Sequence, residues 1–341
     1  TLVVPKEIAV SGIFDVTGGT IQSEVEQETG FTYIGAMYQV QTSVEGVTDD
    51  VWYYTSFANA MGAIGTAYNN EITVSGKYTI DQSYTLEADQ AILSNDSLVT
   101  VGENATITIN ADASVDSAAF IAIEGRVVVN DGGSYRPATY QDEIIYEVMS
   151  SNKETGVTIY SGFKVTLDAA VSGDVIDVVK SATYKGNMTV ISGVTVNVAD
   201  NAKLTVTGNV TVEQNGALNL GSASTLQVGT ADKNNTINVA GTIDVSEGGF
   251  IAPAENAKNV DLYSTGTVVV SNVANITVDV NSAYYEDNAE TVYTSVANAA
   301  AYAATNALTT IYATGTFSET GDVTLDGVNL ELTGVANDIV T

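Results

Sequence analysis

The segment 187–229, NMTVISGVTVNVADNAKLTVTGNVTVEQNGALNLGSASTLQVG, decides the fold, because apolar and polar residues alternate along it in short runs. Alternation with a period of two buries one side of each run and exposes the other. Turn residues such as Asn201, Gly208 and Gly216 separate the runs about every eight residues. Runs this short favour a β-solenoid, in which stacked coils share one core, over a sandwich. The segment 92–129 has the same pattern.

The alternation also predicts which side chains point into the core of the solenoid. The predicted inward positions are Val194, Val196, Val198, Leu204, Val206, Val210, Val212, Leu218, Leu220, Leu226 and Val228.

A second pattern is an internal repeat on both sides of this segment. YYTSFANAMGAI at 53–64 and VYTSVANAAAYA at 292–303 align without a gap, so that Tyr54 falls on Tyr293. A weaker third copy begins at Tyr160. The Ala-rich part of each copy predicts a short helix that leads into a strand. We therefore expect a mainly β protein made of repeated units, each with a short helix followed by β-solenoid-like stacked strands.

The repeat divides the chain into four expected parts. These are an N-terminal strand-rich segment (1–52), a first helix-then-strands unit (53–140), a second unit with the long solenoid tract (141–280) and a third unit (281–341).

The motifs Tyr54–Ala60, Tyr160–Val165 and Tyr293–Ala299 resemble repeats of large prokaryotic β-solenoid surface proteins of the S-layer and adhesin type. The richness in Val, Thr, Asn and Ala is also similar to archaeal S-layers and to the tubular sheaths of filamentous methanogens. The resemblance implies a β-rich protein that assembles into a layer, hoop or filament. The length and the lack of a wall-anchor motif depart from the adhesin pattern.

Composition narrows the function further. The chain has 341 residues, 41 acidic and 11 basic side chains, and a formal net charge of −30. Such an acidic surface repels phosphate backbones, so we expect no nucleic-acid partner. No uninterrupted apolar run is long enough to predict a membrane span. The absence of Cys and the start at Thr1, as after removal of a signal peptide, favour an extracellular, cell-surface protein.

Enzymatic chemistry is not expected. The sequence has no His and no Cys, which removes the commonest general base and the thiol nucleophile. A polysaccharide-cleaving β-helix would need clustered carboxylates, and the solenoid tract contains no adjacent Asp pair. We predict no catalytic residue and no organic cofactor.

Acidic pairs before each repeat are the candidates for a Ca²⁺ site, because Ca²⁺ prefers several oxygen ligands. Solvated surface charge is the simpler interpretation. The candidate ligands are Asp49, Asp50, Asp142, Glu143, Glu286 and Asp287.

Six Asn-x-Ser/Thr sequons are candidate glycosylation sites. They are Asn95, Asn104, Asn187, Asn209, Asn234 and Asn275. The aromatic pairs Tyr53–Tyr54 and Tyr284–Tyr285 are candidates for stacking on sugar rings, although packing between helix and solenoid is the simpler interpretation.

Two functions follow as expectations. In the first, the chain is a structural cell-envelope protein that self-assembles into an S-layer or sheath through strand edges and lateral contacts with itself. The final segment, 321–341, has no polar capping sequence, which favours strand pairing with a neighbouring subunit. In the second, the chain is a carbohydrate-binding or adhesive module that contacts cell-surface glycans.

Overall fold

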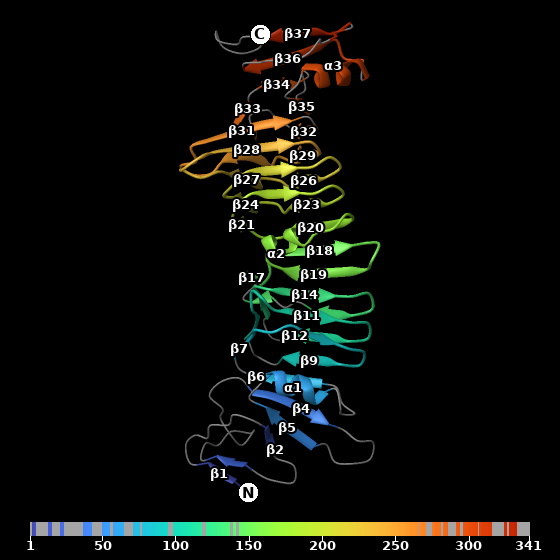
Figure 1. Cartoon of the computed structure of the whole chain (residues 1–341), viewed down its shortest axis with the longest axis vertical. Coiled ribbons are helices and arrows are strands. Elements are labelled where there is room, and N and C mark those ends of the chain that lie inside the picture. The colour runs from blue at the N-terminus through green and yellow to red at the C-terminus, as the bar shows by residue number, and fades with distance from the viewer. Residues whose placement is uncertain are drawn as a thin grey trace. The chain divides into compact units, whose positions relative to one another are not determined.

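The computed structural model is mainly β, with 49% strand, 10% helix and about 9 solenoid turns (Figure 1). It describes residues 2–4, 13–15, 21–23, 37–42, 50–54, 57–64, 71–75, 77–94, 98–117, 121–136, 139–140, 143–264, 266–270, 275–280, 282–285, 291–293, 296–305, 307–315, 324–325 and 327–332. The predicted fold class, repeated short helices followed by β-solenoid strands, is confirmed.

The chain forms two compact units. Unit 1 contains residues 1–146 and 155–162, and unit 2 contains residues 147–154 and 163–341. The four-part division inferred from the repeat is finer and stays a prediction.

Unit 1 is a solenoid whose coils contribute one strand to each of three parallel sheets. The first sheet contains β6 (Glu71–Ser75), β9 (Ala91–Ser94), β12 (Ser114–Ser117) and β15 (Ser134–Arg136). The second contains β7 (Lys77–Ile80), β10 (Leu98–Val101) and β13 (Ile121–Ile123). The third contains β8 (Tyr84–Leu86), β11 (Thr106–Ile109) and β14 (Arg126–Val129), and β19 (Val157–Ser161) joins β14 in the antiparallel direction.

Unit 2 repeats this architecture over more coils, and each sheet is named here by its first strand. The β20 sheet contains β20 (Asp174–Val178), β23 (Thr195–Val198), β26 (Ala217–Leu220), β29 (Thr242–Val245) and β32 (Thr267–Val270). The β21 sheet contains β21 (Ala182–Tyr184), β24 (Lys203–Val206), β27 (Thr225–Val228) and β30 (Phe250–Pro253). The β22 sheet contains β22 (Met188–Val190), β25 (Val210–Val212), β28 (Asn234–Val239), β31 (Asn259–Ser264) and β33 (Asp279–Val280).

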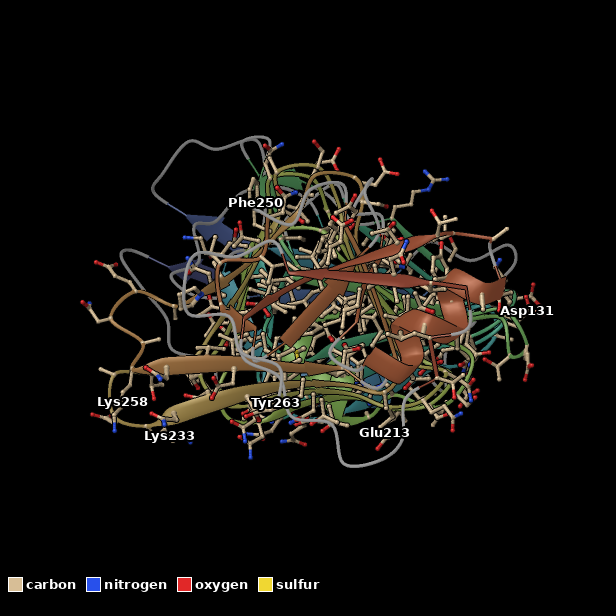
Figure 2. The ribbon with its side chains drawn as sticks, turned by 90° about the horizontal axis from the view of Figure 1, so that it is seen from above. Asp131, Glu213, Lys233, Phe250, Lys258 and Tyr263 are labelled. Carbon is tan, nitrogen blue, oxygen red and sulfur yellow. The ribbon has the colours of Figure 1, made fainter. Side chains whose placement is uncertain are left out.

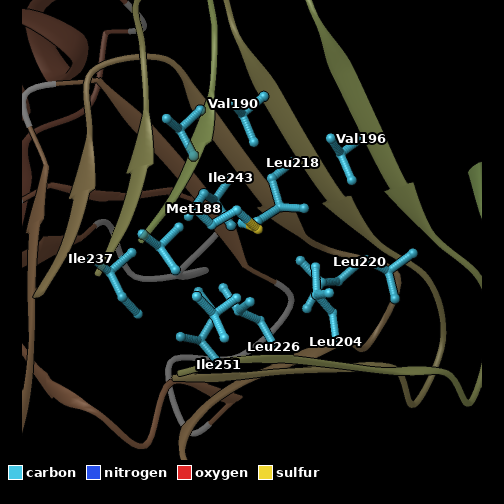
Figure 3. Close-up of a cluster of buried hydrophobic side chains, with 14 of the residues drawn as sticks. Met188, Val190, Val196, Leu204, Leu218, Leu220, Leu226, Ile237, Ile243 and Ile251 are labelled. Atoms are coloured by element: carbon cyan, nitrogen blue, oxygen red, sulfur yellow. The ribbon is translucent and has the colours of Figure 1, made fainter. Parts of the chain in front are cut away.

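The core of unit 2 is a column of aliphatic side chains from all three sheets (Figure 3). Every inward position predicted from the alternation is buried there, whereas the residues that alternate with them within the strands, such as Thr195 and Asn197, are at most half-buried. Register explains the column, because Val196 lies opposite Leu218 and Leu218 opposite Ile243 on successive coils. Each such side chain contributes roughly 1.5–3 kcal/mol by leaving water.

Tight corners join the strands, and two kinds of residue make them possible. Asn201 and Asn215 adopt positive φ values of 60° and 63°, a conformation that Asn tolerates better than most residues. Gly216, Gly241 and Gly266 follow one another on successive coils where the chain turns into the β20 sheet. Thr242 N–H donates to the carbonyl of Gly216 and Thr267 N–H to that of Gly241, both at 2.9 Å, so the coils meet through their backbones at this corner.

A hairpin, a helix and a strand form a recurrent module at the sequence repeats. In unit 1, β4 (Met37–Thr42) lies between β5 (Asp50–Tyr54) and β6 and is antiparallel to both, and α1 (Phe57–Ile64) connects β5 to β6. In unit 2, β34 (Ser282–Tyr285) lies in the same way between β35 (Thr291–Tyr293) and β36 (Thr310–Gly315), and α3 (Val296–Thr305) connects them.

The module also ends one winding and begins another in the reverse strand direction. The strand β35 is antiparallel to β32, the last strand of the β20 sheet, and β36 starts a new parallel pair with β37 (Asn329–Leu332). In unit 1, β2 (Ile13–Asp15) pairs with β5 as β32 pairs with β35. The module is therefore an adaptor between windings.

The middle copy of the module starts the solenoid of unit 2. The helix α2 (Phe163–Asp168) packs on β20 and β21, and β18 (Val148–Asn152) is antiparallel to β20. Phe163 and Leu167 are buried over the end of the core. The remaining strands are β1 (Leu2–Val4), paired with β3 (Ile21–Ser23), and β16 (Thr139–Tyr140), paired with β17 (Glu143–Ile144).

Candidate functional site

The acidic Ca²⁺ candidates fall mostly outside the described residues. Asp49, Asp142, Glu286 and Asp287 lie outside them, and Asp50 in β5 and Glu143 in β17 are placed by their backbone alone. Elsewhere in the described part of the chain, no three Asp or Glu side chains gather closely enough to hold a metal ion. The Ca²⁺ site stays a prediction.

In unit 1, several described acidic residues occupy the same corners on successive coils. Asp89 and Asp112 occupy the same corner on successive coils, where Asp89 N–H donates to the carbonyl of Asp112 at 3.3 Å. Asp81, Glu103 and Glu124 are exposed at a second corner, which we call the acidic corner of unit 1. The spacing of neighbouring strands, about 4.8 Å, brings these like charges together and favours counter-ions around the unit.

Polar side chains on the sheets form hydrogen-bonded ladders from coil to coil. In unit 2, Asn197 donates to Asp177 and Asn219 donates to Asn197, each at 2.8 Å. In unit 1, Asn110 donates to Glu87 and Asn130 to Asn110 at the same distance. These ladders hold the register of coils whose backbones could otherwise slip.

The sequons occupy different environments. Asn104, Asn187 and Asn234 are exposed, Asn209 and Asn275 are half-buried, and Asn95 lies outside the described residues. Asn187, Asn209 and Asn234 lie on three successive coils of unit 2, where the chain enters the β22 sheet.

The side chains of these three asparagines also differ in their hydrogen bonds. The Oδ1 atom of Asn187 accepts the N–H of Asn209 at 3.0 Å. The Oδ1 atom of Asn209 accepts both the Nδ2 of Asn235 at 3.2 Å and the N–H of Thr236 at 3.1 Å. The amide of Asn209 is therefore part of the bonding between coils, whereas the side chain of Asn234 projects into solvent.

The tyrosine pairs proposed for sugar stacking lie in strands of the adaptor modules. Tyr53 and Tyr54 belong to β5, and Tyr284 and Tyr285 belong to β34. Their strands are placed and the stacking role stays a prediction. The exposed aromatic side chains in the described residues are instead Phe250 in β30 and Tyr263 in β31, which lie on two different sheets (Figure 2).

One polar cluster was missed from the sequence. The Tyr184 hydroxyl donates to Oδ1 of Asp168, and the Lys164 ammonium pairs with Oδ2 of Asp168. Lys164 also lies 4.6 Å from the centre of the Tyr184 ring. The spacing of Lys164 and Asp168 by four residues is a visible signal of a helical ion pair, but the arrival of Tyr184 depends on the fold. The cluster ties α2 to the first coil of unit 2.

The Asp168 cluster predicts a small pH dependence of stability. Partial burial raises the pKa of Asp168, but the hydrogen bonds from Lys164 and Tyr184 outweigh it, and the net pKa is lowered. A carboxyl with a lowered pKa stabilises the fold above its unfolded pKa, and this contribution disappears as pH falls through the folded value.

We expect Tyr184→Phe to lower the free energy of unfolding at pH 7 by about 1 kcal/mol or less, because Asp168 is almost half exposed. Urea unfolding at pH 7 and near pH 2 measures the effect, and the difference from the parent should shrink at the lower pH. Tyr184→Phe keeps the edge contact with Phe163, so an equal loss at both pH values would contradict the role of Asp168.

None of the helices among the described residues has the length and apolar character needed to cross a bilayer. No protein-family model, curated protein or solved structure matches this chain. The fold defines the class, a β-solenoid protein with repeated helix-bearing adaptor modules.

Proposed function

We propose that the chain is a structural protein of a cell envelope, which assembles with further copies into an S-layer-like sheet or a tubular sheath. The observation that carries the proposal is the adaptor module, which closes one parallel winding and starts the next. A chain built from such modules extends a scaffold by repetition. The interior of each winding is filled by aliphatic side chains, as expected for a rigid structural protein.

The surface of the solenoid supports the same proposal. Outward columns of Thr, Asn and Asp repeat from coil to coil, so each copy offers regular faces for lateral contact with another copy. The stacked carboxylates of unit 1 repel those of a neighbour, and divalent cations such as Ca²⁺ reduce that repulsion. Assembly on the cell surface through lateral faces and strand edges, helped by cations, is the mechanism that we infer.

Electron microscopy of the purified full chain, with Ca²⁺ or with a chelator, tests this function. We expect sheets, hoops or filaments with a repeat along their length, and more of them with Ca²⁺. Size-exclusion chromatography with light scattering follows the same samples in solution. Discrete monomers under every condition would contradict the proposed function.

A second candidate, a carbohydrate-binding surface module, is favoured by one observation. The side chains of Phe250 and Tyr263 are 38% and 44% exposed, and aromatic rings of this kind stack on sugars. A glycan array with the parent and with the double variant Phe250→Ala, Tyr263→Ala distinguishes the two functions. Binding that the double variant loses favours the second candidate, and an array without signal removes it.

A further inference from the structure

A small projection of unit 2, which we call the rib, carries the exposed sequon Asn234. The rib consists of residues 230–236 and 254–261, where two successive coils are longer than those before them. The strand β28 begins at Asn234, which lies opposite Asn259 of β31, whereas β25 meets β28 only from Ile237. The first residues of β28 therefore extend past the preceding coil, and Figure 2 shows Lys233 and Lys258 at the outer end of the rib.

The rib is anchored on one side and open on the other. The side chain of Asn235 is fully buried, donates to Asn209, and accepts the N–H of Thr230 at 3.3 Å. Because successive side chains of a strand point to opposite sides, the amide of Asn234 points outward. It is exposed and makes no hydrogen bond with any part of the chain that the structure describes.

Charge distinguishes Asn234 from Asn104, which is also exposed. The formal net charge of the rib is only −1, because it carries two basic side chains among three acidic ones: Lys233 and Lys258, and Asp232, Glu255 and Asp261. Asn104, in contrast, sits at the acidic corner of unit 1, beside Glu103. A glycan donor with a polyprenyl phosphate or pyrophosphate group is an anion, and it approaches the two exposed lysines of the rib more easily than a corner lined by carboxylates alone.

The Asn–Asn–Thr sequence on this rib supplies the groups that N-linked modification needs. We propose that Asn234 is the principal N-glycosylation site of the solenoid of unit 2, with a polyprenyl-phosphate-linked sugar as the donor. Its Nδ2 atom forms the bond to C1 of the sugar and gives up a proton. The bond between C1 and the phosphate oxygen breaks, and the polyprenyl phosphate or pyrophosphate leaves with the electron pair. Asn209 stays unmodified, since its amide bonds the coils together. This inference does not depend on assembly.

The positions of the lysines make the test direct. Digestion after lysine of the full protein, isolated from the cells that make it, releases the peptides 186–203, 204–233 and 234–258, each with one sequon. Mass spectrometry of these three peptides measures the occupancy of Asn187, Asn209 and Asn234 separately. We expect added sugar mass on 234–258, located to Asn234 by fragmentation, and an unmodified 204–233.

Variants produced in the same cells test whether the added mass depends on the Asn–Asn–Thr sequence or on the local structure. Asn234→Gln and Thr236→Val should abolish the added mass on 234–258, and Thr236→Ser, which keeps the hydroxyl, should retain it. Asn259→Gln changes the register partner of Asn234 without touching a sequon and should retain it too. A bare 234–258 peptide from the parent, or sugar on Asn209 in preference to Asn234, overturns the proposal.

Discussion

Gly241→Ala should lower the free energy of unfolding by roughly 3 kcal/mol or more, because this corner has no room for a methyl group. A Cβ atom at Gly241 would lie 2.2 Å from the carbonyl oxygen of Gly216 and 2.3 Å from that of Glu213. Both neighbours are backbone atoms, so no side chain can rotate away. The next coil repeats the contact, since a Cβ at Gly266 would lie 2.2 Å from the carbonyl oxygen of Gly241.

The clash would spread because the corner is part of the hydrogen bonding between coils. Gly241 N–H donates to the carbonyl of Val212 at 3.1 Å, and Thr242 N–H donates to that of Gly216. Moving the corner outward to admit the methyl group stretches both bonds. Thermal and urea unfolding, followed by circular dichroism, should therefore show a lower midpoint for the variant than for the parent.

Gly62→Ala is the matched control. Gly62 lies in α1, and a Cβ there would meet nothing within 4 Å. Alanine in a helix is favoured over glycine by about 0.5–1 kcal/mol, so this variant should be as stable as the parent or more so. If Gly241→Ala were as stable as Gly62→Ala, the close stacking at this corner would be wrong.

The core of the solenoid was predictable because its signal is local. Alternation of the type seen at Val194, Val196 and Val198 needs no knowledge of distant residues, and all three are buried. The helices α1 and α3 were predictable from their Ala-rich segments for the same reason, whereas α2 contains no Ala. The cap of α2 was not predictable, because the N–H of Phe163 is bonded by the Glu147 carboxylate, 16 residues away in sequence, at 2.8 Å.

The candidate sites were harder to predict, since they depend on register between coils. The Ca²⁺ candidates are predicted from adjacency in sequence, as for Asp49 and Asp50, whereas proximity in a solenoid depends on which residues of successive coils share a corner. Asp89 and Asp112, which share one corner of unit 1 through a backbone hydrogen bond, come from different coils. The difference between the amides of Asn209 and Asn234 has the same origin, because the partners of Asn209 belong to the next coil.

Val206→Pro should be the second strongly destabilising change, and the protein supplies its own comparison. Val206 in β24 lies opposite Val228 in β27, which lies opposite Pro253 in β30. Proline is thus present in this column, but on β30, the last strand of the β21 sheet. Beyond β30 the described residues pair only through the single Ile251–Ile276 bridge, so a missing N–H costs less there than between two full strands. At Val206, β24 has a strand on each side. A proline there removes a ladder hydrogen bond and a fully buried side chain together.

Val206→Ala separates these two losses, since it shortens the side chain and keeps the N–H. We expect the alanine variant to lose about 1–3 kcal/mol of unfolding free energy through the lost burial, and the proline variant to lose clearly more. Hydrogen exchange should show the additional loss of protection in β21, β24 and β27, because the hydrogen bond lost at Val206 weakens the pairing of β24 with the strands on both sides. Equal unfolding midpoints for the two variants would mean that β24 is not an interior strand, and the order of strands in the β21 sheet would have to be revised.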